Sequence, residues 1–234
     1  MKARGTLWLL PGLLCDASVW QAQAAALGTN VDVCIADFYG FTSITAMAES
    51  VLDQAEGDFA LAGHSMGGRV AMDVMRLAPE RVTRLMLLDT GIAPQAAGEA
   101  EKRAALVDLA QREGMAALAA VWLPPMVHPA RRDDKSLMDP LTDMVCRATP
   151  DIFAGQIRAL LDRPDAAPGL ADIRCPTMIV CGREDAWSPL AQHREIAARI
   201  AGAHLTIIEN SGHMTTVEQP AQVNAALHNW ILSG

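Results

Sequence analysis

The chain has 234 residues, of which 51% are apolar and 20% are charged, and its formal net charge is −8. The apolar fraction excludes a disordered or low-complexity chain, because such chains lack the apolar surface that offsets conformational entropy. The acidic balance argues against nucleic acid or an anionic membrane surface as partners. It does not argue against a small-molecule substrate. A chain of this length is expected to form one large domain with room for a small insertion.

The five cysteines are scattered, odd in number and without a C-x-x-C pair. This pattern argues against a disulfide framework and predicts a cytoplasmic protein. The first residues have the basic and then apolar character of a short signal peptide. However, Pro11-Gly12 interrupts the apolar run, and Leu14 stands where a lipid-modified cysteine needs a small residue. We interpret this segment as a buried strand, and no run approaches the roughly 18–20 apolar residues of a membrane helix.

Short apolar runs alternate with segments of helical period along most of the chain. The runs predict strands over Thr6–Leu10, Val31–Ala36, Asp58–Gly63, Val82–Leu88, Thr177–Cys181 and Leu205–Glu209. The helical periods predict helices over Ser43–Glu56, Gly67–Ala78, Leu190–Ala201 and Ala221–Ile231. This alternation is typical of βαβ units, so we predict an α/β fold with a mostly parallel sheet and helices on both faces.

Residues 94–165 break the alternation. They carry helical patterns without a convincing strand, over Glu99–Arg112, Met115–Trp122, Leu137–Ala148 and Pro150–Leu161. Thr149 before Pro150 is typical of an N-cap followed by a first-turn proline. We therefore predict a helical cap (94–165) inserted between the fourth and fifth strands of a core made of residues 1–93 and 166–234.

The segment Gly63-His64-Ser65-Met66-Gly67 has the form G-x-S-x-G and lies between a predicted strand and a predicted helix. Small residues at 63 and 67 allow a tight turn that projects the serine oxygen at the helix N-terminus, where unpaired N–H groups favour negative charge. We predict Ser65 as a nucleophile. The alternative is a glycine-rich turn without catalysis.

A serine hydroxyl needs a base to become a good nucleophile. Among the six histidines, His213 follows the last predicted strand on a loop at its carboxyl end, where the catalytic groups of open α/β sheets gather. His64 adjoins the serine on the turn and is a poor proton acceptor for it. His193 and His228 lie in helical patterns and are predicted at the surface.

The base in turn needs an acid that holds its tautomer and stabilises the imidazolium. Asp185 follows the fifth predicted strand and completes the order Ser65, Asp185, His213 along the chain. Asp89, after the fourth predicted strand, is the runner-up acid, and Glu184 is a weaker candidate.

Four segments together resemble the α/β-hydrolase family, in particular small capped serine esterases and enol-lactonase-like hydrolases. They are the Gly63–Gly67 elbow, Gly182-x-x-Asp185-x-x-x-Pro189, Gly212-His213 continuing to Glu218-x-Pro220, and the first-strand turn Leu10-Pro11-Gly12-Leu13. The resemblance spans nearly the whole chain and implies an oxyanion hole formed by the backbone N–H groups of Leu13 and Met66. Many relatives carry His-Gly where this chain has Pro11-Gly12.

These features predict a Ser-His-Asp hydrolase that cleaves a carboxylic ester of a small-to-medium, largely apolar substrate. A lactonase or carbon–carbon bond hydrolase acting on a small acidic metabolite would use the same groups, as would an acyltransferase, and a catalytically weak ligand-binding member is a further alternative. No cofactor and no metal are expected, since no phosphate loop, dinucleotide fingerprint or H-E-x-x-H occurs. The charge and the predicted fold are equally compatible with a monomer and with a homodimer.

Methionines and tryptophans suit irregular apolar pockets. Predicted substrate contacts are Leu13, Met66, Trp122, Trp187 and Met214. Cys15 either lines the pocket or is a small buried residue. The predicted cap contains further apolar residues that either line a pocket or fill the core of the cap. They are Met115, Met126, Leu137, Met138 and Met144. Arg69 is predicted as a solvated or ion-paired helix residue, with contact to an acidic substrate as the alternative.

Overall fold

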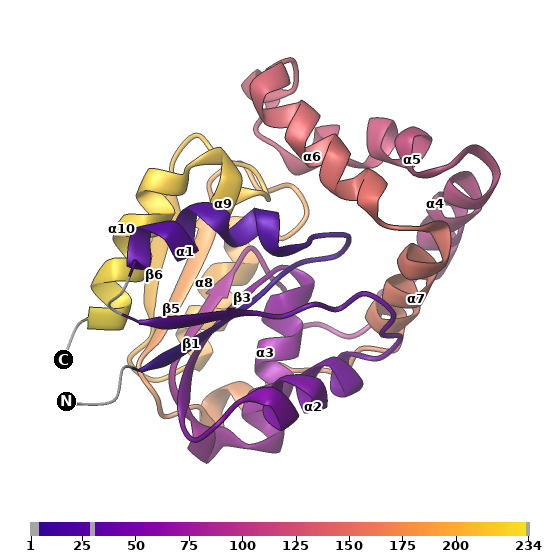
Figure 1. Ribbon diagram of the computed structural model, residues 1–234. Helices are drawn as coiled ribbons and strands as arrows, with labels where there is room; N and C mark the ends of the chain where they lie inside the picture. The colour runs from indigo at the N-terminus through magenta and orange to yellow at the C-terminus, as the bar shows by residue number, and fades with distance from the viewer. Residues whose placement is uncertain (1–4, 29–30, 233–234) are drawn as a thin grey trace.

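The computed structural model describes residues 5–28 and 31–232 of the chain. Their strands form one sheet of six parallel strands in the order β2-β1-β3-β4-β5-β6 (Figure 1). The strands are β1 (Thr6–Leu10), β2 (Asp32–Ile35), β3 (Phe59–His64), β4 (Val82–Leu88), β5 (Thr177–Gly182) and β6 (His204–Ile208). The predicted α/β fold is confirmed, and the sheet is entirely parallel among the described residues.

Helices cover both faces of the sheet (Figure 1). On one face α1 (Gln21–Leu27) packs against α10 (Pro220–Leu232), and on the other α2 (Ile44–Gln54) packs against α3 (Met66–Leu77). The helix α8 (Leu190–Arg199) contacts β5 and β6. The central strands β1, β3, β4 and β5 are largely buried, with helices on both faces of the sheet, so the core is continuous across it.

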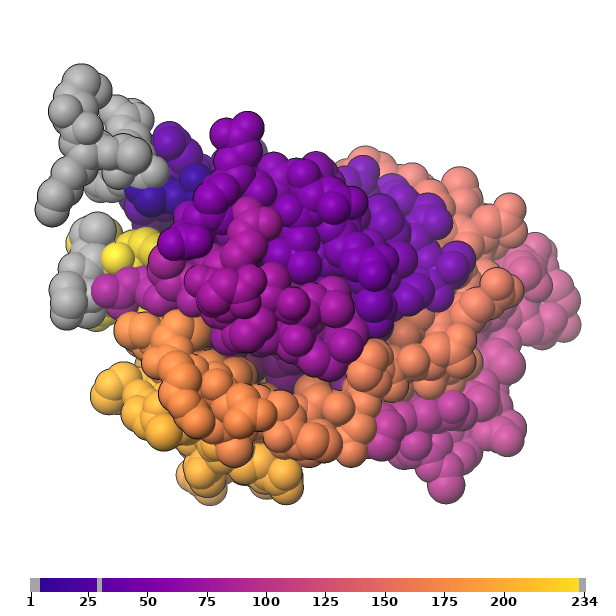
Figure 2. Space-filling view, turned by 90° about the horizontal axis from the view of Figure 1, so that it is seen from below, coloured from indigo at the N-terminus to yellow at the C-terminus, as the bar shows by residue number. Residues whose placement is uncertain are grey.

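Between β4 and β5 the chain forms a helical segment of four helices and two short 3₁₀ turns. The helices are α4 (Glu99–Glu113), α5 (Met115–Trp122), α6 (Lys135–Arg147) and α7 (Pro150–Leu161), and the turns are η3 (Pro124–Met126) and η4 (Pro129–Arg131). Thr149 caps α7, its hydroxyl oxygen accepting a hydrogen bond from the Ile152 N–H at 3.2 Å. The segment lies at one end of the molecule, and α10 lies toward the other (Figure 2).

A buried glutamine ties this helical segment to the sheet. Gln156 of α7 accepts a hydrogen bond from the Leu14 N–H at 2.8 Å and donates one to the Phe38 carbonyl at 3.2 Å. Leu14 follows the turn after β1, so the segment is anchored close to the predicted position of the Leu13 N–H.

The region between β1 and β2 differs from the sequence analysis. It forms η1 (Ala17–Trp20) and α1, which no pattern predicted. The reason is that only Gln23 and Leu27 of α1 are buried, so this short alanine-rich helix has no apolar stripe to detect. Other short elements are η2 (Pro79–Arg81), η5 (Ala167–Asp172) and α9 (Thr215–Glu218). In the described part of the chain, no helix has both the length and the hydropathy needed to cross a membrane.

Candidate active site

Ser65 lies in the sharp turn between β3 and α3, with its backbone in the left-handed region at φ 54°. Two glycines permit this turn. A Cβ on Gly63 would lie 2.3 Å from the Gly67 carbonyl oxygen, and one on Gly67 would lie 2.2 Å from the Leu10 carbonyl oxygen. Non-glycine residues are held in such strained conformations mainly at functional sites. The predicted strand–turn–helix context of the G-x-S-x-G segment is therefore present.

The parallel sheet explains why distant segments meet at Ser65. At the carboxyl edge His64 of β3 pairs with Leu88 of β4, and Gly182 of β5 pairs with Ile208 of β6. The loops that leave these strands consequently emerge side by side, which is where open α/β sheets place their ligands.

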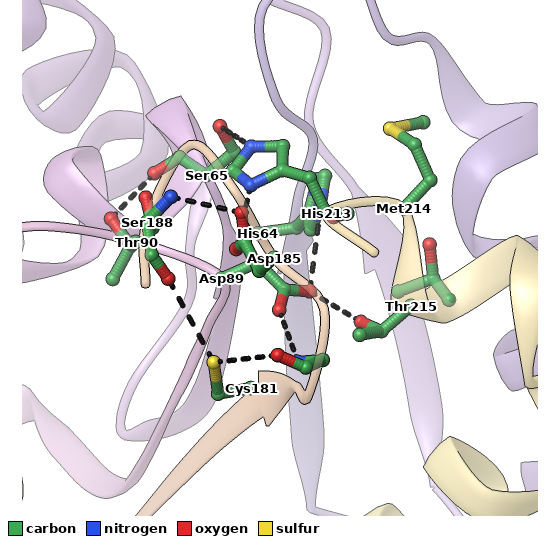
Figure 3. A network of polar contacts seen from close by, with 12 residues as sticks. His64, Ser65, Asp89, Thr90, Cys181, Asp185, Ser188, His213, Met214 and Thr215 are labelled. Atoms are coloured by element: carbon green, nitrogen blue, oxygen red, sulfur yellow. Dashed lines mark hydrogen bonds and ion pairs between the residues drawn. The ribbon is translucent and has the colours of Figure 1, made fainter. Parts of the chain in front are cut away.

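His213 connects Ser65 to Asp185 through two hydrogen bonds (Figure 3). Its Nε2 lies 2.8 Å from the Ser65 Oγ, and its Nδ1 lies 2.8 Å from the Asp185 Oδ2. The other carboxylate oxygen of Asp185 accepts hydrogen bonds from the N–H groups of Trp187 and Ser188, at 2.8 and 2.9 Å. These contacts orient the carboxylate toward the imidazole, an arrangement that can activate a serine hydroxyl.

Burial and charge act in opposite directions on this pair. Burial by itself lowers the pKa of His213, but the charge and hydrogen bond of Asp185 outweigh it, so the pKa lies above its ordinary value. Burial raises the pKa of Asp185, but the charge and hydrogen bond of His213 bring it below its usual range. Asp185 is therefore ionised at neutral pH and accepts the Nδ1–H, which leaves Nε2 of the neutral ring as a proton acceptor.

The two other acids predicted as candidates have different partners. The carboxylate of Asp89 accepts hydrogen bonds from the Gly182 N–H, at 2.9 Å, and from the Thr215 hydroxyl. Burial, followed by the charge of Asp185, raises the pKa of Asp89 well above its ordinary value. Glu184 accepts from the Ser211 N–H at 3.1 Å. Across the described residues, Asp185 is the acid that hydrogen-bonds to His213.

His64 supports the backbone of His213. Its Nε2 lies 2.7 Å from the His213 carbonyl oxygen, and because a carbonyl can only accept, this nitrogen carries the hydrogen. Burial, followed by the charge of His213, lowers the pKa of His64 to about 4. His64 is consequently a neutral donor to the loop of His213.

A buried glutamate that the sequence analysis did not single out organises the same loop. One carboxylate oxygen of Glu218 accepts from the N–H groups of Gly212 and Met214, at 2.8 and 3.2 Å, on either side of His213. The other accepts from the His128 N–H of the helical segment at 2.7 Å. The His213 N–H itself donates to the Met126 carbonyl at 2.7 Å. The signal in the sequence was the glutamate five residues after His213, in the Glu218-x-Pro220 motif.

We expect Glu218→Gln to lower both stability and activity. The amide of glutamine keeps one acceptor oxygen but places an NH₂ group against backbone N–H donors. The hydrogen bond to a charged oxygen that is lost in this way is worth about 1.5–3 kcal/mol. Thermal unfolding and kcat measurements with the exposed control Glu195→Gln test this expectation. Equal melting temperatures and rates for both variants would contradict a supporting role for Glu218.

A cavity of about 70 Å³ opens beside Ser65 and His213. All five residues predicted to contact a substrate line it, namely Leu13, Met66, Trp122, Trp187 and Met214. Cys15 and Met126 line it as well. Three other apolar residues of the helical segment are buried away from this cavity, namely Met115, Leu137 and Met144, and Met138 is partly buried against the core. They form the packing of the segment, which was the alternative left open for them.

Arg69 was predicted as a solvated or ion-paired residue, with contact to an acidic substrate as the alternative. It is partly exposed and forms no ion pair among the described residues. It lines the cavity together with Ser65, and its guanidinium donates to the Ala93 carbonyl, in the loop after β4, at 2.9 Å. Periodicity alone could not reveal this contact, because Ala93 belongs to a distant segment.

His193 was predicted at the surface but is fully buried, whereas His228 is exposed as predicted. His193 Nε2 accepts a hydrogen bond from the Thr90 N–H at 3.0 Å. With Asp89 and Cys181 it forms a buried group of three potential metal ligands. The Asp89 oxygens are already used by Gly182 and Thr215, and the His193 nitrogen by Thr90, so an ion there would have to displace these hydrogen bonds.

The parallel sheet, the serine turn and the inserted helices define an α/β-hydrolase fold. The model of the alpha/beta hydrolase family matches residues 9–226, and the chain belongs to that family. The chain is 26% identical over 236 residues to a pimeloyl-[acyl-carrier protein] methyl ester esterase of Aromatoleum aromaticum, covering 93% of this chain and 94% of the relative.

Solved structures agree with this assignment. A thermophilic esterase from Thermogutta terrifontis, with malate bound, superimposes with a TM-score of 0.91 at 27% identity, covering 98% of this chain and 90% of the other. The enol-lactonase from Burkholderia xenovorans LB400 has a TM-score of 0.89 at 23% identity, covering 98% and 92%, which shows the shared fold. Family and relatives together support hydrolase activity, and the predicted resemblance to esterases and enol-lactonases is confirmed.

Proposed function

We propose that this chain is a serine hydrolase that cleaves carboxylic esters through an acyl-enzyme. The observation that carries the proposal is the hydrogen-bonded series Ser65–His213–Asp185 at the wall of a cavity. A serine in a strained turn, a histidine whose second nitrogen is held by an ionised acid, and an adjoining cavity are parts that acyl transfer needs.

In the proposed reaction the Ser65 Oγ attacks the ester carbonyl while His213 Nε2 takes its proton. The N–H groups of Leu13 and Met66 stabilise the oxyanion, and His213 then protonates the departing alcohol. Water attacks the acyl-enzyme with His213 again as the base, which releases the acid and restores Ser65. Each oxyanion donor is worth about 3–4 kcal/mol in the transition state.

The small cavity and its apolar lining support a small-to-medium acyl group. Two relatives described as esterases, from A. aromaticum and T. terrifontis, support an ester as the scissile group. Lactone opening and carbon–carbon bond cleavage would use the same three residues, and transfer to an alcohol or thiol would replace water in the second step. A cytoplasmic location, and a monomer or homodimer that binds a small molecule, stay predictions from the sequence.

Initial rates on p-nitrophenyl esters from acetate to palmitate test the proposal. We expect turnover with an optimum at short acyl chains, because the cavity beside Ser65 is narrow. Added alcohol or thiol acceptors, with product analysis, separate hydrolysis from acyl transfer. If no ester of the series turns over while lactones do, the ester assignment is wrong and the lactonase alternative replaces it.

A further inference from the structure

Arg69 is a partly buried cation that lines the cavity of the proposed nucleophile together with Ser65. In residues 5–28 and 31–232 it forms one hydrogen bond, to the Ala93 carbonyl, and no ion pair. A guanidinium carries five N–H donors, so Arg69 has donors available for a further partner. A cation at the wall of a cavity, without an ion pair, is placed to bind an anionic group.

Glu99, the acid whose charge acts on Arg69, is already paired with other cations. Glu99 of α4 pairs with Arg103 at 2.8 Å and with Arg163 through both of its oxygens, at 2.8 and 2.7 Å. Three arginines therefore surround one carboxylate. Burial, followed by the charge of Arg163, lowers the pKa of Arg69 to about 9, which is the effect expected of uncompensated positive charge.

This positive region continues outward from the cavity. Arg69 and Arg103 also line an adjoining cavity of about 690 Å³, whose walls carry five cationic and three acidic side chains. The whole chain has a net charge of −8, so the lining of this adjoining cavity has the opposite sign to the protein. Such an arrangement concentrates and orients anions.

We propose that Arg69 binds a carboxylate of the substrate, and that the site therefore takes half-esters of short dicarboxylic acids. This inference rests on the proposed ester hydrolysis and deepens it. The planar guanidinium matches a carboxylate in a bidentate pair. An anion would supply the ion-pair partner that Arg69 lacks among the described residues and would explain why an arginine lines the cavity beside Ser65.

The helix fixes the spacing between the two ends of the substrate. Ser65 directly precedes α3 and Arg69 lies in its first turn, four residues later, so the two are separated by about 6 Å along the helix axis. A chain of a few methylene groups bridges such a distance. Adipate half-ester is the probe that we choose, because its chain separates the ester carbonyl from the free carboxylate by four methylenes.

The test compares methyl hydrogen adipate with methyl hexanoate, in which a methyl group replaces the carboxylate. Proton release at constant pH gives kcat/KM for both esters. We expect wild type to prefer the acidic ester, and Arg69→Met to lower the ratio of acidic to neutral kcat/KM roughly 10- to 100-fold, the range for one hydrogen-bonded charge. The control Arg112→Met removes an exposed arginine of α4, outside both cavities, and should leave the ratio unchanged.

A binding measurement separates this inference from the proposed function. Calorimetric titration of the Ser65→Ala enzyme with adipate should show binding that Arg69→Met weakens by a similar factor. Adipate binding without ester turnover would uphold the carboxylate site and overturn ester hydrolysis. Turnover with an unchanged ester ratio in Arg69→Met, or with no adipate binding, would overturn the carboxylate site alone. If Arg69→Met does not fold, Arg69→Lys retains the charge but loses the planar fork, and the same ratio should fall by a smaller factor.

Discussion

Replacing Ser65 by alanine should abolish hydrolysis, with a loss on the order of 10⁴–10⁶ in kcat. In the proposed mechanism the hydroxyl oxygen forms the acyl-enzyme, and alanine removes it without filling the space around the turn. The left-handed backbone at this position is as strained for alanine as for serine, so folding should be little affected. Initial rates on the best ester of the chain-length series measure the loss.

A serine-directed phosphonate gives an independent readout. Intact-protein mass should increase by one adduct in wild type and remain unchanged in Ser65→Ala. The matched control Ser50→Ala, on α2 away from the site, should retain both the rate and the adduct. Retention of more than a few per cent of the wild-type rate by Ser65→Ala would rule out the proposed mechanism.

Asp185→Asn should cost about 10⁴-fold in kcat, whereas Asp89→Asn should cost less than about tenfold. At 185 the amide no longer fixes the Nδ1–H tautomer of His213 or stabilises the imidazolium. At 89 the amide oxygen still accepts from the Gly182 N–H, and the Thr215 hydroxyl can turn to accept from the amide. The two variants thus compare the loss in kcat on replacing acids at the ends of two adjacent strands. Comparable losses in both would make Asp89 part of the mechanism.

The pH dependence of activity follows from the hydrogen bond between Asp185 and His213. His213 acts as a base only when neutral, so activity should fall as the pH drops through its pKa, which Asp185 holds above the ordinary value of about 6.5. Asp185→Asn removes that negative charge, so the acid limb of its residual activity should move to lower pH. A limb that stays in place, measured as kcat/KM across the pH range, would contradict the assigned partner.

The sequence pattern predicted the strands and the candidate residues at their ends, because strands and tight turns are specified by short segments. Continuous apolar runs predicted all six strands, and the glycines at 63 and 67 predicted the turn at Ser65. Asp185 and His213 were found because they follow strands, and parallel strands end at one edge. The helix α1 was missed because it buries too few side chains to leave a periodic pattern.

Residues whose environment comes from distant segments could not be placed in the same way. His193 and Arg69 lie in helical patterns that are ordinarily solvent-facing. The loop after β4 contacts both, since Thr90 donates to His193 and the Ala93 carbonyl accepts from Arg69. The role of Glu218 depends on three N–H groups that come from two separate parts of the chain. No spacing within a single segment encodes such contacts.

The sequence by itself determined the α/β class, the inserted helices and the candidate Ser65, Asp185 and His213, since strand ends and glycine turns are properties of short segments. Only the tertiary structure decided which acid contacts His213, because Asp89 and Asp185 both follow parallel strands and differ in the hydrogen bonds that reach them. It also decided the charge of the cavity. Arg69 and Glu99 are thirty residues apart, and the pairing of Glu99 with Arg163 arises from a contact between segments that are distant in the chain.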